Sequence, residues 1–179
     1  MNAPRLLALF QNLPVFGDHA NDILPNQLWL GDIHAALDAN WLKKTGITHI
    51  VSVLSFQAEQ VAIYPEQFRY LSVFAHDNTR ENLKQYWPLT TDFIRGALSR
   101  GGKVLVHCKF GRSRSTATLA AYLIAGLDYS PTQALSLIRE RRPQVAPNTA
   151  FVKQLYDWGM EHKLTLANGT PKVHLTATL

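Results

Sequence analysis

The sequence predicts an α/β domain built on a central, mainly parallel, twisted sheet that is flanked by helices. First, short strand-like apolar runs alternate with segments of helical periodicity along the chain, which is the pattern of a layered α/β fold. Second, the segment at residues 48–55 is β-branched and almost continuously apolar, as strands buried on both faces of a parallel sheet are. Third, 46% of the 179 residues are apolar and 17% are charged, which is enough to bury one core of ordinary size.

The first half of the chain carries three candidate strands and one helix. Residues 1–24 are expected to form an N-terminal extension, with a short docking helix over residues 4–12. The candidate strands are QLWLGD, THIVSVLS and FRYLSVFA, at residues 27–32, 48–55 and 68–75. Asp32 can cap a helix over residues 33–44, and Gly46 ends that helix.

The second half contains four helices and one short strand. The helices are expected over residues 83–99, 114–125, 131–141 and from residue 148 to about residue 160, and the strand KVLVH lies at 103–107. Pro88 and Pro131 fall near helix starts, where a missing N–H is tolerated, and Gly126 ends the second helix. The polar segment HDNTREN at 76–82 is a loop. These elements predict one domain over residues 25–160, followed by a C-terminal tail at 161–179.

The charge distribution favours an acidic ligand. The formal net charge is +5, and basic residues cluster at 109–114 and 139–142. A nucleic-acid-binding stripe needs more basic residues than this, so no nucleic-acid partner is expected. Within the second cluster, Arg139, Arg141 and Arg142 are interpreted as a solvated helix end that interacts favourably with the helix dipole.

The sequence contains a single cysteine, Cys108. One cysteine cannot form an internal disulfide, which favours a reducing compartment. We therefore expect an intracellular, cytoplasmic protein, with the nucleus as a further location. No apolar run reaches the roughly 18 residues that a membrane helix needs, so no transmembrane segment is expected.

Cys108 stands where a strand ends and a helix is about to begin. Ligands of parallel sheets bind beyond the carboxyl ends of the strands, and residues 108–114 leave the strand at that end. Their backbone N–H groups and the following helix dipole form an anion site suited to phosphate. Gly111 supplies backbone freedom, and Arg114 can bind two phosphate oxygens. The same donors lower the pKa of the thiol from about 8.5, which makes the thiolate a strong nucleophile near pH 7.

The leaving oxygen also needs a proton donor. Asp77 lies in the polar loop directly after a strand, where it can reach over the anion site. A carboxyl group there protonates the leaving oxygen and then acts as a base for water. Asp92 is the alternative, but it falls inside an expected helix, which is a less mobile element. The sequence therefore favours Asp77.

The stretch HCKFGRSRS, residues 107–115, resembles the His-Cys-x5-Arg-Ser signature of the cysteine-dependent protein tyrosine phosphatase superfamily. More closely, the chain resembles a small, atypical dual-specificity phosphatase that consists of the catalytic domain. LWLGDIHAALDANWLKKTGITHIVSVLS resembles the opening of those domains, FRYLSVFAHDN their general-acid region and RPQVAPNTAFVKQL their closing segment. The matches run in order over residues 25–160 and imply the three-layer fold of that superfamily.

The resemblance implies a role for each matching residue. Cys108 is the nucleophile that forms a thiophosphate ester, Asp77 is the general acid, and Ser115 donates a hydrogen bond to the cysteine sulfur. His107 and Asn148 support the loop. The residues that bind the substrate are Lys109, Phe110, Gly111, Arg112, Ser113 and Arg114. No metal or other cofactor is implied, and a phosphate or sulfate ion is expected to occupy the loop.

Three functions follow from this resemblance. The first is hydrolysis of phosphotyrosine, phosphoserine and phosphothreonine in a phosphorylated protein through a phosphocysteine intermediate, and the segment PNTAF at 147–151 favours this protein-directed branch. The second is a phosphoinositide or other phospholipid phosphatase, in which Lys109 and Arg112 read an additional phosphate of the head group. The third is a catalytically inactive phosphopeptide-binding module. Such modules usually lack the cysteine, whereas this chain has Cys108, Arg114 and Asp77.

Overall fold

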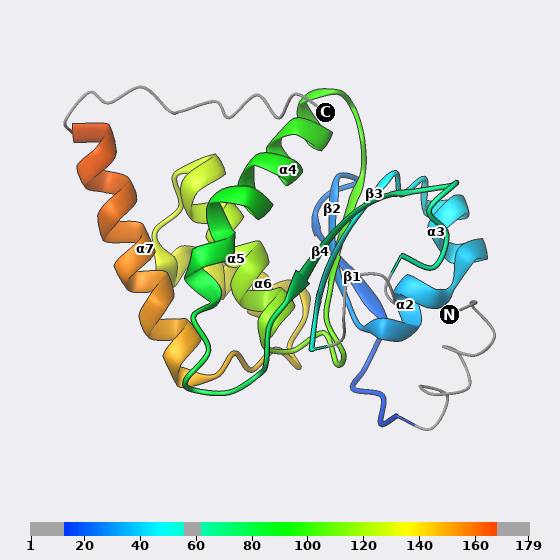
Figure 1. Cartoon of the computed structure of the whole chain (residues 1–179), viewed down its shortest axis with the longest axis horizontal. Coiled ribbons are helices and arrows are strands. Elements are labelled where there is room, and N and C mark those ends of the chain that lie inside the picture. Colours follow the sequence, from blue (N-terminus) through cyan, green and yellow to red (C-terminus); the bar gives the residue numbers. More distant parts are fainter. Residues whose placement is uncertain (1–12, 56–61, 168–179) are drawn as a thin grey trace.

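A five-stranded sheet forms the middle layer of the molecule (Figure 1). The computed structural model describes residues 13–55 and 62–167, so the helix expected over 4–12 lies outside the described residues. In spatial order the strands are β1 (Ala20–Leu24), β2 (Leu28–Gly31), β5 (Val104–His107), β3 (His49–Leu54) and β4 (Arg69–Phe74). β2, β5, β3 and β4 are parallel neighbours, and only β1 runs antiparallel, at one edge. The mainly parallel sheet is therefore confirmed.

Helices cover both faces of the sheet, which confirms the three-layer fold (Figure 1). One face carries the short helices α2 (Ile33–Leu37) and α3 (Ala39–Thr45). The other face carries α4 (Trp87–Ser99), α5 (Arg114–Leu127), α6 (Pro131–Arg141) and α7 (Thr149–Ala167), with a 3₁₀ turn, η2 (Leu83–Tyr86), before α4. The central strand β5 shows why both faces are needed. Val104 and Val106 pack toward α4–α7, whereas Leu105 packs into the cluster beneath α2 and α3.

The segment expected as an N-terminal extension contributes an edge strand. β1 lies within residues 1–24 and pairs with β2 from Ala20 opposite Gly31 to Leu24 opposite Leu28. Its sequence, ANDIL, carries only one fully buried side chain, Ile23. A partly polar edge strand of this kind lacks the apolar run that marks a central strand, so the pattern did not predict it.

Two of the expected helices differ in form from the prediction. The helix expected over 33–44 is two helices, because Asp38 ends α2 and its side chain accepts a hydrogen bond from the Trp41 N–H at the start of α3. Gly126 does not end α5. The Tyr122 ring packs against this glycine, and a Cβ there would come within 2.6 Å of Tyr122 Cε2. The helix instead ends at Asp128, which adopts a left-handed conformation with φ 59°.

The last helix is longer than expected. α7 continues to Ala167, so residues 161–167 of the expected tail are helical. Two contacts hold these additional turns against the rest of the domain: Glu161 forms an ion pair with Lys84, and His162 Nε2 lies within hydrogen-bond distance, 2.9 Å, of Asp128 Oδ1. Both partners lie far away in the sequence, which is why local periodicity did not extend the helix this far.

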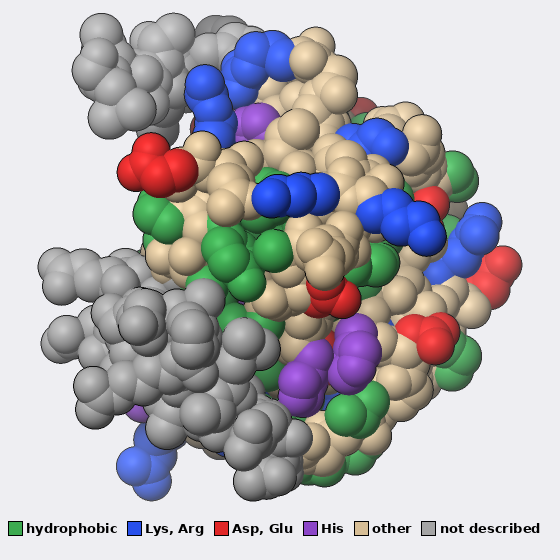
Figure 2. Space-filling view, turned by 90° about the vertical axis from the view of Figure 1, so that its right-hand side faces the viewer, with side chains coloured by type: hydrophobic (Ala, Val, Ile, Leu, Met, Phe, Trp, Pro, Cys, Tyr) green, Lys and Arg blue, Asp and Glu red, His purple; other side chains and the backbone are tan. Residues whose placement is uncertain are grey.

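Two expectations from the sequence concern the surface: the absence of a membrane helix and the absence of a stripe of basic residues. Across the described residues, no helix is both long enough and apolar enough to cross a membrane. On the face that carries α2 and α3, Lys and Arg side chains are spread among acidic and histidine side chains (Figure 2).

Candidate active site

The segment between β5 and α5, residues 108–114, curls around a cavity of about 200 Å³; we call it the Cys108 loop. The cavity is lined by Asp77, Cys108, Phe110, Arg112, Ser113, Arg114 and Ala146. It lies beyond the carboxyl end of β5, where the topology predicted a ligand site. Three segments that are distant in sequence therefore meet at this point: the loop after β4, the Cys108 loop and the segment before α7.

Cys108 is buried at the floor of this cavity. Burial raises the pKa of the thiol, but the positive charge of Arg114 and hydrogen bonds from Ser115 and from the backbone of Arg112 outweigh it, so the pKa lies below its ordinary value. The Ser115 hydroxyl donates to Cys108 Sγ over 3.1 Å. The surroundings therefore favour the thiolate, the nucleophilic form of cysteine.

Arg114 is buried beside the cysteine, in the first turn of α5. Its Nη1 donates to the Ala75 carbonyl over 3.1 Å, which fixes the guanidinium from the end of β4. Its Nε has no hydrogen-bond partner among the described residues, and lies 3.8 Å from Asp77 Oδ2. A buried guanidinium that lines the cavity and keeps an unused donor is suited to bind an oxyanion.

Asp77 is held over the cavity by two donors. Its Oδ1 accepts from Ser113 Oγ at 2.7 Å and from Asn148 Nδ2 at 2.9 Å. The Asn148 backbone N–H also donates to Ser113 Oγ, and its Oδ1 caps α7 through the Phe151 N–H. Asn148 thus contacts the Cys108 loop through the Ser113 side chain and also caps a helix. This network joins the Asp77 loop, the Cys108 loop and the start of α7.

His107 is completely buried behind Cys108, and its Nε2 lies 2.7 Å from Ser52 Oγ on the neighbouring strand β3. Burial lowers the pKa of this imidazole to about 4. The ring is therefore neutral near pH 7 and contributes orientation rather than positive charge to the site.

Lys109 and Arg112 both lie against aromatic rings. The Lys109 ammonium is 5.1 Å from the centroid of the Phe110 ring. The Arg112 guanidinium lies 4.5 Å from the ring centroid of Phe16, and its Nε donates to the Gln144 carbonyl over 2.9 Å. Phe16, which the sequence placed in the N-terminal extension, also makes an edge-to-face contact with Phe110 at 5.9 Å. Sequence periodicity offered no signal for this contact.

The interpretation of Arg142 as part of a solvated helix end is wrong. Its side chain is completely buried, whereas Arg139 and Arg141 are exposed. Arg142 Nε donates to the Gly111 carbonyl at 2.9 Å, and Nη1 donates to the Asp18 carbonyl at 2.7 Å and to Asn21 Oδ1. Because α6 ends at Arg141, the next residue turns inward beneath the Cys108 loop. One feature of the sequence could have indicated that Arg142 differs from Arg139 and Arg141: it is the first residue of the segment RPQVAPN, which follows the helix.

Gly111 is packed tightly above Arg142. Its φ is +63°, and a Cβ there would lie 2.7 Å from both Arg142 Nη2 and the Gly31 backbone. The backbone freedom expected of this glycine is therefore used, and its missing side chain also lets the loop approach the end of β2.

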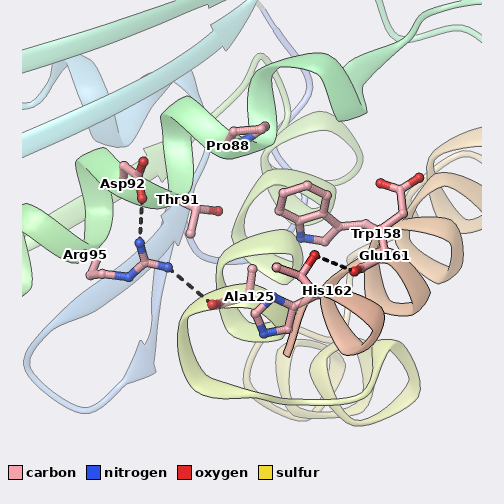
Figure 3. A pocket seen from close by; sticks show the side chains of 9 residues that line it. Pro88, Thr91, Asp92, Arg95, Ala125, Trp158, Glu161 and His162 are labelled. Carbon is pink, nitrogen blue, oxygen red and sulfur yellow. Dashed lines mark hydrogen bonds and ion pairs between the residues drawn. The ribbon is translucent and has the colours of Figure 1, made fainter. Parts of the chain in front are cut away.

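Asp92, the alternative proton donor, lies elsewhere. It is on α4 and pairs with Arg95, whose Nη2 also donates to the Ala125 carbonyl over 3.2 Å (Figure 3). These residues line a separate cavity between α4, α5 and α7, together with Trp158 and His162. None of the residues that line this cavity also lines the cavity at Cys108.

The family model described as "Dual specificity phosphatase, catalytic domain" matches residues 28–161, three quarters of the chain. The chain belongs to the dual specificity phosphatase family. This confirms the family, fold and enzyme class that the sequence predicted, and supports a cysteine-dependent protein phosphatase with Cys108 in its loop.

Individual relatives are similar to most of the chain. The chain is 36% identical over 140 residues to Dual specificity protein phosphatase 1 of Arabidopsis thaliana, which covers 78% of the chain and 69% of the relative. It is 38% identical over 157 residues to the human Serine/threonine/tyrosine-interacting protein, covering 84% and 70%. The solved structure of human DUSP28 superposes with a TM-score of 0.76 at 28% identity, over 84% of the chain and 99% of that structure.

Replacement of Arg142 by lysine should impair the site while keeping the positive charge. Arg142 reaches the Gly111 carbonyl with Nε and the Asp18 and Asn21 acceptors with Nη1, whereas lysine has a single nitrogen, so at least one buried acceptor should lose its donor. We expect kcat/KM for p-nitrophenyl phosphate to fall about tenfold or more, because the loop geometry loosens. Arg141→Lys, at the exposed neighbouring position, should stay within about twofold. Wild-type kinetics in Arg142→Lys would contradict the anchoring role.

Ser115→Ala should raise the pKa of the Cys108 thiol, because the thiolate loses a hydrogen-bond donor. The rate of alkylation by iodoacetamide, measured against pH, reports the thiolate fraction. The inflection should move to higher pH, so that alkylation near pH 6 is slower than in the wild-type chain. Thr118→Ala, on the same helix, provides a matched control that should leave the inflection in place. An unchanged profile in Ser115→Ala would contradict this role.

Proposed function

We propose that the chain hydrolyses phosphotyrosine, phosphoserine and phosphothreonine in proteins through a phosphocysteine intermediate. The observation that carries the proposal is the arrangement around one small cavity: a buried, low-pKa thiol at its floor, Arg114 beside the thiol and Asp77 held above it. Nucleophile, oxyanion-binding group and proton donor are the three parts that transfer of a phosphoryl group to cysteine needs.

In the first step the Cys108 thiolate attacks phosphorus. An S–P bond forms while the P–O bond to the leaving group breaks, and the Asp77 carboxyl delivers its proton to the leaving oxygen. Asp77 Oδ1 already accepts two hydrogen bonds, so Oδ2 is the oxygen assigned to carry that proton. The Arg114 guanidinium and the loop N–H groups bind the three equatorial oxygens, on which the negative charge is spread.

In the second step water releases the phosphate. The Asp77 carboxylate takes a proton from water, the water oxygen attacks phosphorus and the S–P bond breaks. The Ser115 hydroxyl, 3.1 Å from the sulfur, stabilises the departing thiolate. Inorganic phosphate leaves, and Asp77 is again protonated for the next cycle.

The relatives support a protein substrate. One of them is named "Dual specificity protein phosphatase 1", which fits a site that accepts several phosphoresidues. We also propose that the protein works in a reducing, intracellular location. The sequence contains no second cysteine that could protect an oxidised Cys108 by an internal disulfide.

A phosphopeptide-binding module is the less favoured alternative. One similar solved structure is that of a "tyrosine phosphatase-like serine/threonine/tyrosine-interacting protein", with 35% identity and a TM-score of 0.73. A protein of this fold can therefore be named for an interaction. The lowered pKa of Cys108 and the Ser115 hydrogen bond argue for turnover here. Both features serve a sulfur that attacks and then leaves, and simple phosphate binding requires neither.

A phospholipid phosphatase is the second candidate, because Arg112 lines the cavity and can contact a further anionic group. Its Nε is engaged by the Gln144 carbonyl and its guanidinium covers Phe16. These contacts give the Arg112 side chain a structural role that needs no additional phosphate. This favours the protein substrate.

The general acid can be tested by the choice of leaving group. Cys108→Ser should reduce turnover of p-nitrophenyl phosphate to background, and Asp77→Asn should lower kcat by about 10²–10⁴-fold on phosphotyrosyl peptide. The loss in Asp77→Asn should be smaller on p-nitrophenyl phosphate, whose electron-poor phenolate leaves without a proton. Asp92→Asn is the matched control and should keep the wild-type kcat. Full activity in Cys108→Ser, or a loss in Asp92→Asn in place of Asp77→Asn, would refute the mechanism.

The substrate class can be tested with a Lys109→Ala, Arg112→Ala double variant. We expect kcat/KM for phosphotyrosyl and phosphothreonyl peptides to exceed that for phosphoinositides and phosphatidylglycerophosphate in the wild-type chain. The double variant should change the peptide values by less than about tenfold, because these cations interact with aromatic rings and the Gln144 carbonyl. A wild-type preference for lipids that the double variant abolishes would establish the phospholipid phosphatase instead.

A further inference from the structure

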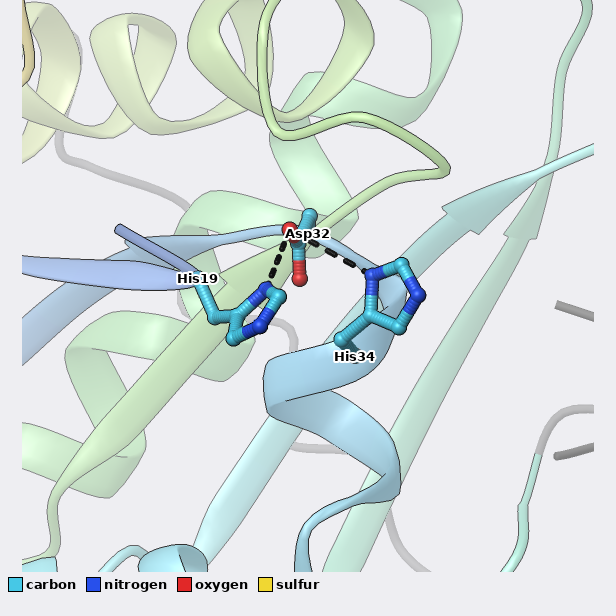
Figure 4. A group of neighbouring side chains, drawn as sticks. All are labelled: His19, Asp32 and His34. Carbon is cyan, nitrogen blue, oxygen red and sulfur yellow. Dashed lines mark hydrogen bonds and ion pairs between the residues drawn. The ribbon is translucent and has the colours of Figure 1, made fainter. Parts of the chain in front are cut away.

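Three potential metal ligands meet where β1, β2 and α2 come together (Figure 4). His19 directly precedes β1, Asp32 directly follows β2, and His34 lies in the first turn of α2. One ligand atom from each residue lies within 4.8 Å of the other two. We propose that His19, Asp32 and His34 form a binding site for zinc or a similar divalent transition-metal ion.

The distances are close to those that a metal ion requires. His19 Nδ1 lies 2.9 Å and His34 Nδ1 lies 3.6 Å from the same oxygen, Asp32 Oδ2. Zinc bonds of about 2.0–2.2 Å at tetrahedral angles place the ligand atoms roughly 3.3–3.6 Å apart. The two distances to Asp32 Oδ2 lie near this range, so the three ligand atoms are already close to the separations that an ion requires.

Asp32 is already oriented for this role. Its side chain is buried, and its Oδ1 accepts a hydrogen bond from the Ala35 N–H over 3.0 Å, which leaves Oδ2 directed at the two histidines (Figure 4). The Asp32 N–H donates to the His19 carbonyl over 2.9 Å, so the backbone joins the two segments that carry these ligands. A carboxylate held by a second partner keeps its geometry when a metal binds, which strengthens the site.

The ligand types select the metal. Two imidazole nitrogens and one carboxylate oxygen suit zinc and its neighbours, whereas calcium and magnesium prefer oxygen ligands throughout. Three protein ligands leave a fourth position for water or another ligand. The His19 side chain is 50% exposed and that of His34 is 21% exposed, so an ion can enter from solvent. Figure 2 shows two neighbouring histidine side chains at the surface of this face.

The arrangement of the two histidine rings around one carboxylate also suits a bound cation. Their ring centroids are 4.9 Å apart, and both Nδ1 atoms are directed at a single carboxylate. A divalent ion binds imidazole nitrogen and carboxylate oxygen together, so one ion between these groups can be bound by all three residues. The bound ion would join the segment before β1 to the segment that runs from the end of β2 into α2, so it should stabilise the folded chain.

Zinc binding should be measured in the Cys108→Ser chain without a histidine tag, because the Cys108 thiolate is itself a zinc ligand. Titration against a fluorescent zinc chelator should show one ion per chain. The His19→Ala, His34→Ala double variant in the same background should bind at least about 100-fold more weakly, since it retains one of three ligands. His76→Ala, His162→Ala is the matched control, with two histidines removed elsewhere, and should bind as the parent does.

Two further measurements separate a metal site from a simple hydrogen-bonded cluster. Free zinc at about 100 times its Kd should raise the Tm of the parent by roughly 5–10 °C and leave the double variant unchanged. Cobalt should give the strong visible absorption of a four-coordinate ion in the parent. His19→Ala alone, at a half-exposed position, tests the same losses if the double variant does not fold. Equal zinc affinity in parent and His19→Ala chains, or no saturable binding in the parent, would overturn the proposal.

Discussion

The burial of the Cys108 thiol, whose proposed role needs a thiolate, is the constraint on which most of this structure depends. Burial alone disfavours a thiolate, so the fold must supply donors that outweigh it: the Arg114 charge, the Ser115 hydroxyl and the backbone amides of the Cys108 loop. Each unit by which a pKa moves corresponds to about 1.36 kcal/mol of differential stabilisation. That requirement explains why a strand end and a helix start meet here, because few other arrangements direct so many N–H groups at one atom.

The donors act only if the loop keeps its shape, and its shape is set from outside. Arg142 binds the Gly111 carbonyl from below, and Gly31 packs against the same glycine. From the other side, Ser113 and Asn148 bind Asp77, so the proposed proton donor and the loop that carries Cys108 are joined by one network. A change at any of these supporting residues is therefore expected to affect catalysis without removing a group that touches the substrate.

The sequence predicted what local patterns encode. The parallel strands begin and end within one or two residues of the predicted bounds. Runs such as THIVSVLS are both β-branched and almost entirely apolar, and this combination favours a buried strand. The His-Cys-x5-Arg-Ser signature identified the residues of the Cys108 loop in the sequence. In the structure, Cys108, Arg114 and Asp77 line the same cavity. Features set by distant partners were missed. Arg142 is 124 residues from Asp18, Phe16 is 96 residues from Arg112, and the proposed ligands His19, Asp32 and His34 follow no recognisable spacing.

The contacts of the N-terminal segment bear on how this enzyme should be produced and compared with its relatives. The family match begins at residue 28, which invites an expression boundary there. A chain trimmed to that boundary would keep every residue of the phosphatase signature, yet it would lose the edge strand β1, the Asp18 and Asn21 acceptors of Arg142 and the Phe16 ring beneath Arg112. Kinetic constants from such a fragment would describe a looser loop with a freer arginine, and differences between family members could then reflect where each chain was cut.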